Sequence, residues 1–342
     1  MKAVRLHAYN EPPTLDQVPE PAITGPHDVI VRVGGAGLCR TDLHIRDGWF
    51  AAAVPIDLPL VLGHENTGWV HEVGSAVEGL AVGDAVICHP QTSCGRCPAC
   101  RIGQDMGCAR GLAFNGLTRD GGFAELVKTG DRAVLPLPSG LEPAAVAPHA
   151  DAGLTVMHVV RKAVPVLDPG SRVVVVGIGG LGHIAVQCLR AMTAAEIIAV
   201  DPDPDSLKLA ADCGAHHLVS ADEGQGERVL ALTDGAGADA VIDFVGEGDA
   251  VASSLAMVRP GGTYFVVGYG GELRVPTFNL VLGELNIVGN AVGTHDDLRE
   301  LVALTAAGGV NLRTRSYPLE AFADAFADLE QGRMHGRGVL VP

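Results

Sequence analysis

Apolar runs and amphipathic stretches alternate between residues 172 and 290, and this alternation constrains the fold more than any other feature. Val- and Ile-rich strands are predicted at 172–177, 196–201, 216–220, 238–246, 263–268 and 285–290. Helices are predicted between them at 179–192, 206–214 and 227–235, and a helix that runs into a turn is predicted at 250–262. Because each crossover helix has to cover a face of the sheet, strands that alternate with helices indicate a parallel, doubly wound sheet. We therefore expect an α/β domain over 153–290.

The turn after the first strand reads GIGGLG at 177–182 and so has the form G-x-G-x-x-G. In a chain with 45 glycines this pattern can also be an ordinary strand–helix turn. Here it follows an apolar strand and opens a helix, as a dinucleotide-binding turn requires. Gly177 permits the tight turn, Gly179 lets a pyrophosphate approach the backbone at the helix start, and Gly182 allows close helix–strand packing.

The next strand ends at Asp201, whose carboxylate can accept hydrogen bonds from the ribose hydroxyls of a bound dinucleotide. A carboxylate at this position repels a 2′-phosphate, and the following PDPDS segment offers no Lys or Arg to bind one. The alternative is that Asp201 only caps the following helix. We expect the cofactor to be NAD rather than NADP.

Four of the eight cysteines crowd into fifteen residues, at Cys94, Cys97, Cys100 and Cys108. Four thiolates close a tetrahedral zinc shell and leave no position for water, so a zinc ion here would be structural. An iron–sulfur cluster and free thiols are the alternatives. The remaining cysteines at 88, 188 and 213 lie in apolar contexts and are predicted to be buried.

Cys39, His64 and Asp151 could supply sulfur, nitrogen and oxygen donors to a second zinc ion. A catalytic zinc needs about three protein ligands and one open position. Each of these residues alone is more often structural, and His149 is a rival third ligand. Short Val-rich runs between Gly and Pro predict a largely β domain over 1–152. The segment 291–342 is expected to return to that domain.

The formal net charge of −16 makes nucleic acid and anionic membrane surfaces unlikely partners. No apolar stretch is long enough for a transmembrane helix, and the start of the chain lacks the apolar region of a secretory signal. We expect a cytoplasmic protein.

On these motifs the chain resembles the zinc-containing medium-chain alcohol dehydrogenases over its whole length. Residues 63–68 read G-H-E-x2-G and precede Gly74 and Val77, which matches the zinc signature of that family. Asp151 stands at a position where many members have a cysteine. In this respect the chain resembles the bacterial NAD-dependent secondary alcohol dehydrogenases. The resemblance implies a GroES-like catalytic domain, a Rossmann NAD-binding domain, two zinc ions per chain and a homodimer or homotetramer.

The resemblance also gives roles to single residues. Cys39, His64 and Asp151 are expected to ligate the catalytic zinc, Asp42 to hold His64, and Glu65 to approach the metal when its ligands rearrange. Thr41 is expected to take the alcohol proton, and His44 to form the outer end of the relay through the NAD ribose. The expected cofactor contacts are Gly177, Gly179, Gly180, Leu181, Gly182, Asp201, Val245, Val267, Gly268 and, at the pyrophosphate, Arg337.

The implied activity is the oxidation of alcohols to ketones or aldehydes, and the reverse, with hydride transfer to nicotinamide. Trp49 and Phe50 are expected to line an apolar substrate pocket, which favours hydrophobic secondary alcohols, although both could simply belong to the core. A polyol or threonine dehydrogenase of the same family is the first alternative. A non-catalytic NAD-binding relative without its metal is the second.

Overall fold

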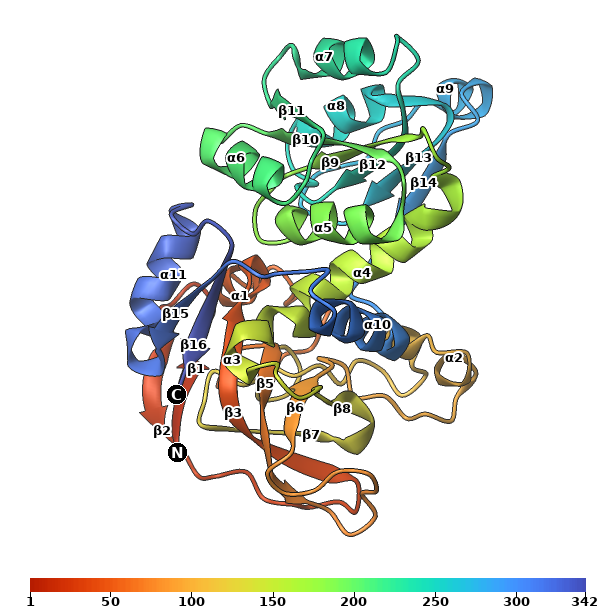
Figure 1. Cartoon of the computed structure of the whole chain (residues 1–342). Helices are drawn as coiled ribbons and strands as arrows, with labels where there is room; N and C mark the ends of the chain where they lie inside the picture. The colour runs from red at the N-terminus through yellow and green to blue at the C-terminus, as the bar shows by residue number, and fades with distance from the viewer. The chain divides into compact units, whose positions relative to one another are not determined.

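The computed structural model describes every residue from 1 to 342 and divides into two compact units (Figure 1). Unit 1 consists of Met1–Leu154, Gly293–Ala307 and Leu312–Pro342, and unit 2 of Thr155–Val292 and Gly308–Asn311. Both main boundaries lie two residues beyond the expected ones at 152 and 290. The segment Gly308–Asn311 joins unit 2 because the Gln187 amide bonds the backbone N–H and C=O of Asn311, at 2.8 and 3.1 Å.

Unit 2 is built on a six-stranded sheet in which all neighbouring strands are parallel. In spatial order the strands are β11 (His217–Ser220), β10 (Glu196–Asp201), β9 (Arg172–Val176), β12 (Ala238–Asp243), β13 (Val258–Val266) and β14 (Asn286–Gly289). The chain starts in the middle at β9, runs to one edge, and then crosses to the other side. This order confirms the doubly wound sheet, whose ligand crevice lies at the carboxyl ends of β9 and β12.

Helices cover both faces of this sheet. Figure 1 shows α5 (Gly182–Met192) and α6 (Pro204–Asp212) on one face, with α7 (Gln225–Leu232) and α8 (Ala250–Ala256) on the other. One face of the strands packs into a fully buried cluster that includes Val174, Val241 and Tyr264.

The segment 250–262, predicted as a helix that runs into a turn, begins with the helix α8 as expected. The predicted turn is wrong, because β13 already begins at Val258. Pro260 lacks a backbone N–H donor, and the two glycines after it disfavour a helix. The short helix α9 (Thr277–Leu282), between β13 and β14, was not predicted.

Unit 1 contains two sheets, as the prediction of a largely β domain requires. The larger one has the order β15 (Thr314–Pro318), β16 (Arg337–Val341), β3 (Asp28–Leu38), β5 (Glu65–Val73), β6 (Ala85–Cys88) and β8 (Val134–Pro136), with β7 (Leu126–Gly130) also paired to β3. The smaller one has the order β2 (Thr14–Gln17), β1 (Lys2–Leu6) and β4 (Leu60–Val61).

The helices of the first 150 residues are short, namely α1 (Arg40–Arg46), α2 (Pro98–Arg101) and α3 (Pro143–Val146). Longer helices follow as α4 (Ala152–Ala163), α10 (His295–Ala306) and α11 (Phe322–Glu330). The tail returns to unit 1 as expected, through β16 between β15 and β3. β15 was not predicted because four of its five residues are exposed, so it shows no apolar alternation. None of the helices is long and apolar enough to cross a membrane.

Candidate metal centres and cofactor site

The pairing of β3 with β5 brings Cys39 and His64 together, although 25 positions separate them in the chain. In the antiparallel register Gly37 lies opposite Glu65, so the end of β3 meets the start of β5. Cys39 follows directly after β3, and His64 directly precedes β5. A side chain at position 37 would collide with the Glu65 carboxylate, because an added Cβ would lie 1.9 Å from Glu65 Oε2. Glycine at this position therefore makes room for the acidic group.

Asp151 reaches the same place from the 3₁₀ turn Ala147–Ala150, which packs against β5 and β3. Its Oδ2 lies 3.4 Å from His64 Nε2. One ligand atom from each of Cys39, His64, Glu65 and Asp151 falls within 4.8 Å of all the others. The structure thus gathers the three predicted ligands and their predicted acidic neighbour into one cluster.

Several polar atoms of this cluster are buried and accept or donate no hydrogen bond. They are both ring nitrogens of His64, Oε2 of Glu65, Oδ1 of Asp151 and Oδ1 of Asp42. Buried polar atoms normally have partners, because desolvation without one costs about 1–3 kcal/mol each. Burial disfavours the charged imidazole, but the carboxylates of Asp42 and Asp151 outweigh it and raise the pKa of His64 well above its usual value. The residues present therefore fit a bound cation, and sulfur, nitrogen and oxygen donors suit zinc.

His149, the rival third ligand, is fully buried but belongs to a different environment. Its Nε2 lies 3.0 Å from the hydroxyl of Thr305 on α10. It is also absent from the cluster of candidate ligands. The geometry therefore favours Asp151.

Arg337, which is expected to contact the cofactor pyrophosphate, lies next to the candidate zinc ligands. Its guanidinium donates to Glu65 Oε1 at 2.5 Å, and the same oxygen accepts the backbone N–H of Ala152 at 3.1 Å. Arg337 is only 4% exposed. Burial opposes its charge, but the Glu65 carboxylate and the Cys39 side chain keep its pKa raised. Sequence reasoning missed this ion pair, and the pyrophosphate contact stays a prediction.

Helix α1 carries the residues expected to hold His64 and to move protons. Asp42 is fully buried, with Oδ1 3.3 Å from His64 Nδ1 and Oδ2 accepting the backbone N–H of Cys39 at 2.9 Å. Thr41 and His44 are three residues apart and so share one side of the helix. Trp49, expected in the substrate pocket, stacks on His44 and is 53% exposed, whereas Phe50 is half-buried.

Phe114 is a further neighbour of the zinc cluster that the sequence did not reveal. Its ring centroid lies 5.9 Å from that of His64, and the residue is 6% exposed. It sits in a loop held by backbone hydrogen bonds from 117, 118 and 119 to its own carbonyl. An aromatic ring here makes one side of the metal cluster apolar.

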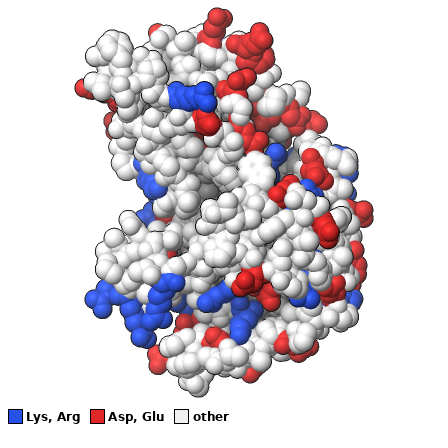
Figure 2. Space-filling view, turned by 180° about the vertical axis from the view of Figure 1, so that it is seen from behind, with Lys and Arg blue, Asp and Glu red and all other residues white.

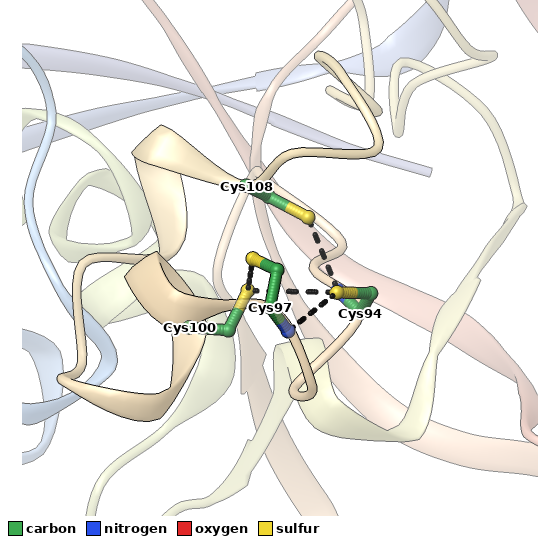
Figure 3. Close-up of side chains that lie close together, drawn as sticks. All are labelled: Cys94, Cys97, Cys100 and Cys108. Carbon is green, nitrogen blue, oxygen red and sulfur yellow. Dashed lines mark hydrogen bonds between the residues drawn. The ribbon is translucent and has the colours of Figure 1, made fainter.

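The other four cysteines converge on one point, as Figure 3 shows. Cys97 Sγ and Cys94 Sγ lie 3.4 and 3.9 Å from Cys100 Sγ, and all four thiols are free of disulfides. Zinc–sulfur bonds of about 2.3 Å place the corners of a tetrahedron about 3.8 Å apart. The four sulfur atoms therefore fit a single zinc ion.

Backbone N–H groups turn toward these thiols and favour their ionised form. Those of Arg96 and Cys97 lower the pKa of Cys94 to about 6, whereas burial raises that of Cys100 to about 11. Behind the cysteines, Asp105 is buried and accepts hydrogen bonds from Arg132 at 2.9 Å and Ser93 at 2.5 Å. This ion pair ties the cysteine loop to the turn before β8.

The glycine-rich turn in unit 2 has the geometry that its sequence predicts. Gly177 has a φ of +85°, which favours glycine. A Cβ on Gly182 would lie 2.0 Å from the Gly177 carbonyl oxygen, whereas one on Gly179 would meet nothing within 4 Å. The turn is therefore tight, and its middle is open to a ligand at the start of α5.

Asp201 ends β10 and braces this turn. Its Oδ2 accepts the backbone N–H of Ile178 at 2.7 Å, and its Oδ1 accepts that of Asp203 at 2.9 Å. Burial raises the pKa of Asp201. Asp203, not Asp201, caps α6. A ribose contact through the remaining lone pairs stays a prediction.

A pocket of about 570 Å³ opens beside the turn, lined by Gly177 and Val245 among others. Its charged lining residues are all acidic, namely Asp222, Glu223 and Asp249. In the view of Figure 2, acidic side chains lie along the top and one side of unit 2. Val267 and Gly268 do not line this pocket; their N–H groups donate to the Asp243 carbonyl at 3.0 Å each. A cofactor contact from either residue stays a prediction.

Two family models match the chain: an alcohol dehydrogenase GroES-like domain over 25–139 and a zinc-binding dehydrogenase domain over 180–307. An NAD-dependent alcohol dehydrogenase of Sulfolobus acidocaldarius is 36% identical, with 99% of both chains covered. The chain belongs to the zinc-binding alcohol dehydrogenase family.

Other members of this family show how closely the fold is shared and how far the chemistry varies. The crystal structure of the alcohol dehydrogenase from Aeropyrum pernix superposes with a TM-score of 0.97 at 44% identity, covering all of both chains. A D-arabinose 1-dehydrogenase (NADP⁺) of Saccharolobus solfataricus is 31% identical over 100% of this chain and 97% of its own. Family membership confirms the predicted fold class and two-zinc chemistry, but leaves the substrate open.

Proposed function

We propose that this zinc dehydrogenase uses NAD to oxidise hydrophobic secondary alcohols to ketones, and catalyses the reverse reaction. The single observation that carries this proposal is the cluster of Cys39, His64 and Asp151 beside Glu65, which contains buried polar atoms that make no hydrogen bond. Three protein ligands leave a fourth position on zinc for the substrate.

A zinc ion held by Cys39, His64 and Asp151 would supply Lewis-acid chemistry at the substrate oxygen, and NAD would supply the hydride acceptor. The chain's own residues hold and move the proton. Asp42 orients the His64 ring, which fixes the ring nitrogen available to the metal. Thr41 would hold the alcohol proton at its hydroxyl, and His44 would form the outer end of the relay that delivers this proton to water when NAD is bound. The guanidinium of Arg337 balances the negative charge of Glu65. This carboxylate therefore adds no net charge next to the candidate zinc ligands.

The aromatic ring of Phe114 and the half-buried ring of Phe50 support an apolar substrate. An apolar pocket wall offers no hydrogen bonds to replace the water lost by the additional hydroxyl groups of a polyol or sugar. This argues against such substrates. The decisive experiment is NADH formation by the zinc-loaded protein over matched primary, secondary and cyclic alcohols and a sugar panel. We expect secondary and cyclic alcohols to have the highest kcat/KM, and a preference for sugars would contradict the proposal.

Asp201 and the acidic pocket lining support NAD as the coenzyme, so we expect a large preference over NADP. Asp201→Ala should raise the KM for NAD about 10-fold or more, because a charge-assisted hydrogen bond contributes about 1.5–3 kcal/mol. The same variant should reduce the preference for NAD over NADP, measured as the ratio of the two kcat/KM values. Steady-state kinetics with both coenzymes checks this, and Asp203→Ala, which removes the cap of α6, is the control. Equal use of NAD and NADP by the unaltered enzyme would contradict the assignment.

Helix α9 presents an apolar face beside the edge strand β14, which supports a homo-oligomer. Phe278, Val281 and Leu282 are 71%, 68% and 68% exposed. We expect Val281→Asp to shift the assembly toward smaller species in sedimentation velocity, because a charge in an apolar interface loses its hydration. Val82→Asp, equally exposed at 68% but in unit 1, should leave the assembly unchanged. A monomeric unaltered protein would contradict this prediction.

A further inference from the structure

An indole ring covers one face of the histidine at the outer end of the expected proton relay. The ring centroids of Trp49 and His44 are 4.3 Å apart, and the ring planes differ by 12°. His44 is 8% exposed and Trp49 is 53% exposed. The indole therefore lies between much of the imidazole and solvent.

The backbone at the end of α1 dictates this arrangement. Gly48 adopts a φ of +75°, and its N–H donates to the Ile45 carbonyl at 3.1 Å. The Trp49 N–H donates to the His44 carbonyl at 3.0 Å. These two bonds form a Schellman motif, which characteristically sets the residue after the glycine against the third residue from the helix end. The stack is therefore fixed by the helix end before any substrate binds.

We propose that Trp49 is a positioning residue that holds the His44 imidazole in the one rotamer from which it can pass a proton. This inference rests on the proposed function, in which His44 is the outer end of the relay. It differs from the expectation that Trp49 lines the substrate pocket. A stacked ring restricts rotation about the side-chain bonds of His44, and it contacts the face of the imidazole rather than the edge that carries the nitrogen atoms.

Loss of the stack should slow proton delivery without weakening substrate or NAD binding. We expect Trp49→Leu to lower kcat for alcohol oxidation about 2- to 10-fold, in line with the interaction of a stacked aromatic pair. The KM values for alcohol and NAD should change less than about twofold. A change in the KM for alcohol with an unaltered kcat would instead place Trp49 in the substrate pocket and overturn the proposal.

Leucine and phenylalanine separate stacking from helix capping. Leucine keeps an apolar side chain against the third residue from the helix end but provides no ring. Phenylalanine provides both the apolar contact and an aromatic ring. We expect Trp49→Phe to restore most of kcat, with both variants melting close to the unaltered protein. If Trp49→Leu and Trp49→Phe lower kcat equally, an aromatic ring at this position does not help to hold His44, and the proposal fails.

A double-mutant cycle tests whether Trp49 acts through His44. In a His44→Asn background, Trp49→Leu should have no further effect on kcat. Full additivity of the two changes would overturn the positioning role. If His44→Asn alone leaves kcat unchanged, the proposed relay fails; if it slows turnover but Trp49→Leu does not, only the role of Trp49 fails.

Fluorescence reads the stack without any turnover, because Trp49 and Trp69 are the only tryptophans in the chain. In the Trp69→Phe variant all indole emission comes from Trp49. Because the imidazole packs directly on the indole, adding His44→Asn should change the intensity of this emission. An emission that His44→Asn leaves unaltered would overturn the stack.

Discussion

The Cys39→Ser variant is expected to lose one of two zinc ions per chain and to oxidise alcohols at least about 10³-fold more slowly. The sulfur of Cys39 belongs to the buried cluster with His64 and Asp151, and its loss opens the ligand shell. Zinc contributes several kcal/mol of charge stabilisation in such reactions, and each 1.36 kcal/mol is a factor of ten. NAD binding should survive, because the glycine-rich turn lies in unit 2.

Metal analysis, turnover and NAD titration on the same preparation check this prediction. Cys88→Ala is the matched control, because Cys88 is buried in β6 outside both metal clusters. Burial raises the pKa of its thiol to about 12, so it stays protonated. The control should keep both zinc ions and near-normal turnover. A Cys39→Ser enzyme with two zinc ions and a normal rate would rule out the assigned ligand set.

The Cys97→Ser variant is expected to lose the other zinc ion and to melt about 10 °C or more below the unaltered protein. Zinc bound in such four-cysteine shells contributes more than 10 kcal/mol of apparent binding free energy to the folded state. The loop 94–108 has little core of its own, because only three of its fifteen residues are buried, namely Cys100, Asp105 and Cys108. A loss of about 3–5 kcal/mol corresponds to a shift of this size in a domain of 150–250 residues.

Calorimetry with metal analysis tests this second prediction, and Ile102→Ala is its control within the same loop. The Ile102 side chain is 71% exposed and is not among the candidate zinc ligands, so its truncation should leave the zinc content and the melting temperature unchanged. Freshly prepared Cys97→Ser protein should retain the catalytic zinc. If it melts like the unaltered protein after losing its zinc, the four-cysteine site is not structural.

The sequence predicted those features that are local in the chain. The cysteine spacing at 94–108 and the glycines at 177–182 are short patterns, and each is sufficient to define a turn with its ligand atoms. The six strands of unit 2 were found for the same reason, since each is a continuous apolar run. The start of β13 was not found, because Arg259, Pro260 and the two glycines after it are typical of a turn rather than of a strand.

Long-range partners could not be read from the chain. The ion pair of Arg337 with Glu65 joins residues 272 positions apart, and it exists because β16 pairs with the end of β3. No local pattern announces that pairing. The choice between Asp151 and His149 depended likewise on how the turn before α4 packs on β5. By contrast, Gly48 after α1 is a recognisable helix-end signal, and it could have indicated that Trp49 folds back onto His44.

The most direct test of the account is the rate of NAD reduction by a secondary alcohol, measured while zinc is returned to metal-depleted protein. The two clusters differ in exposure of their ligands and in ligand type, so the four-cysteine site is expected to fill first. The rate should stay near zero up to one zinc per chain, rise in proportion to the second, and stop rising at two. Full activity at one zinc per chain, or in zinc-free protein, would contradict the account.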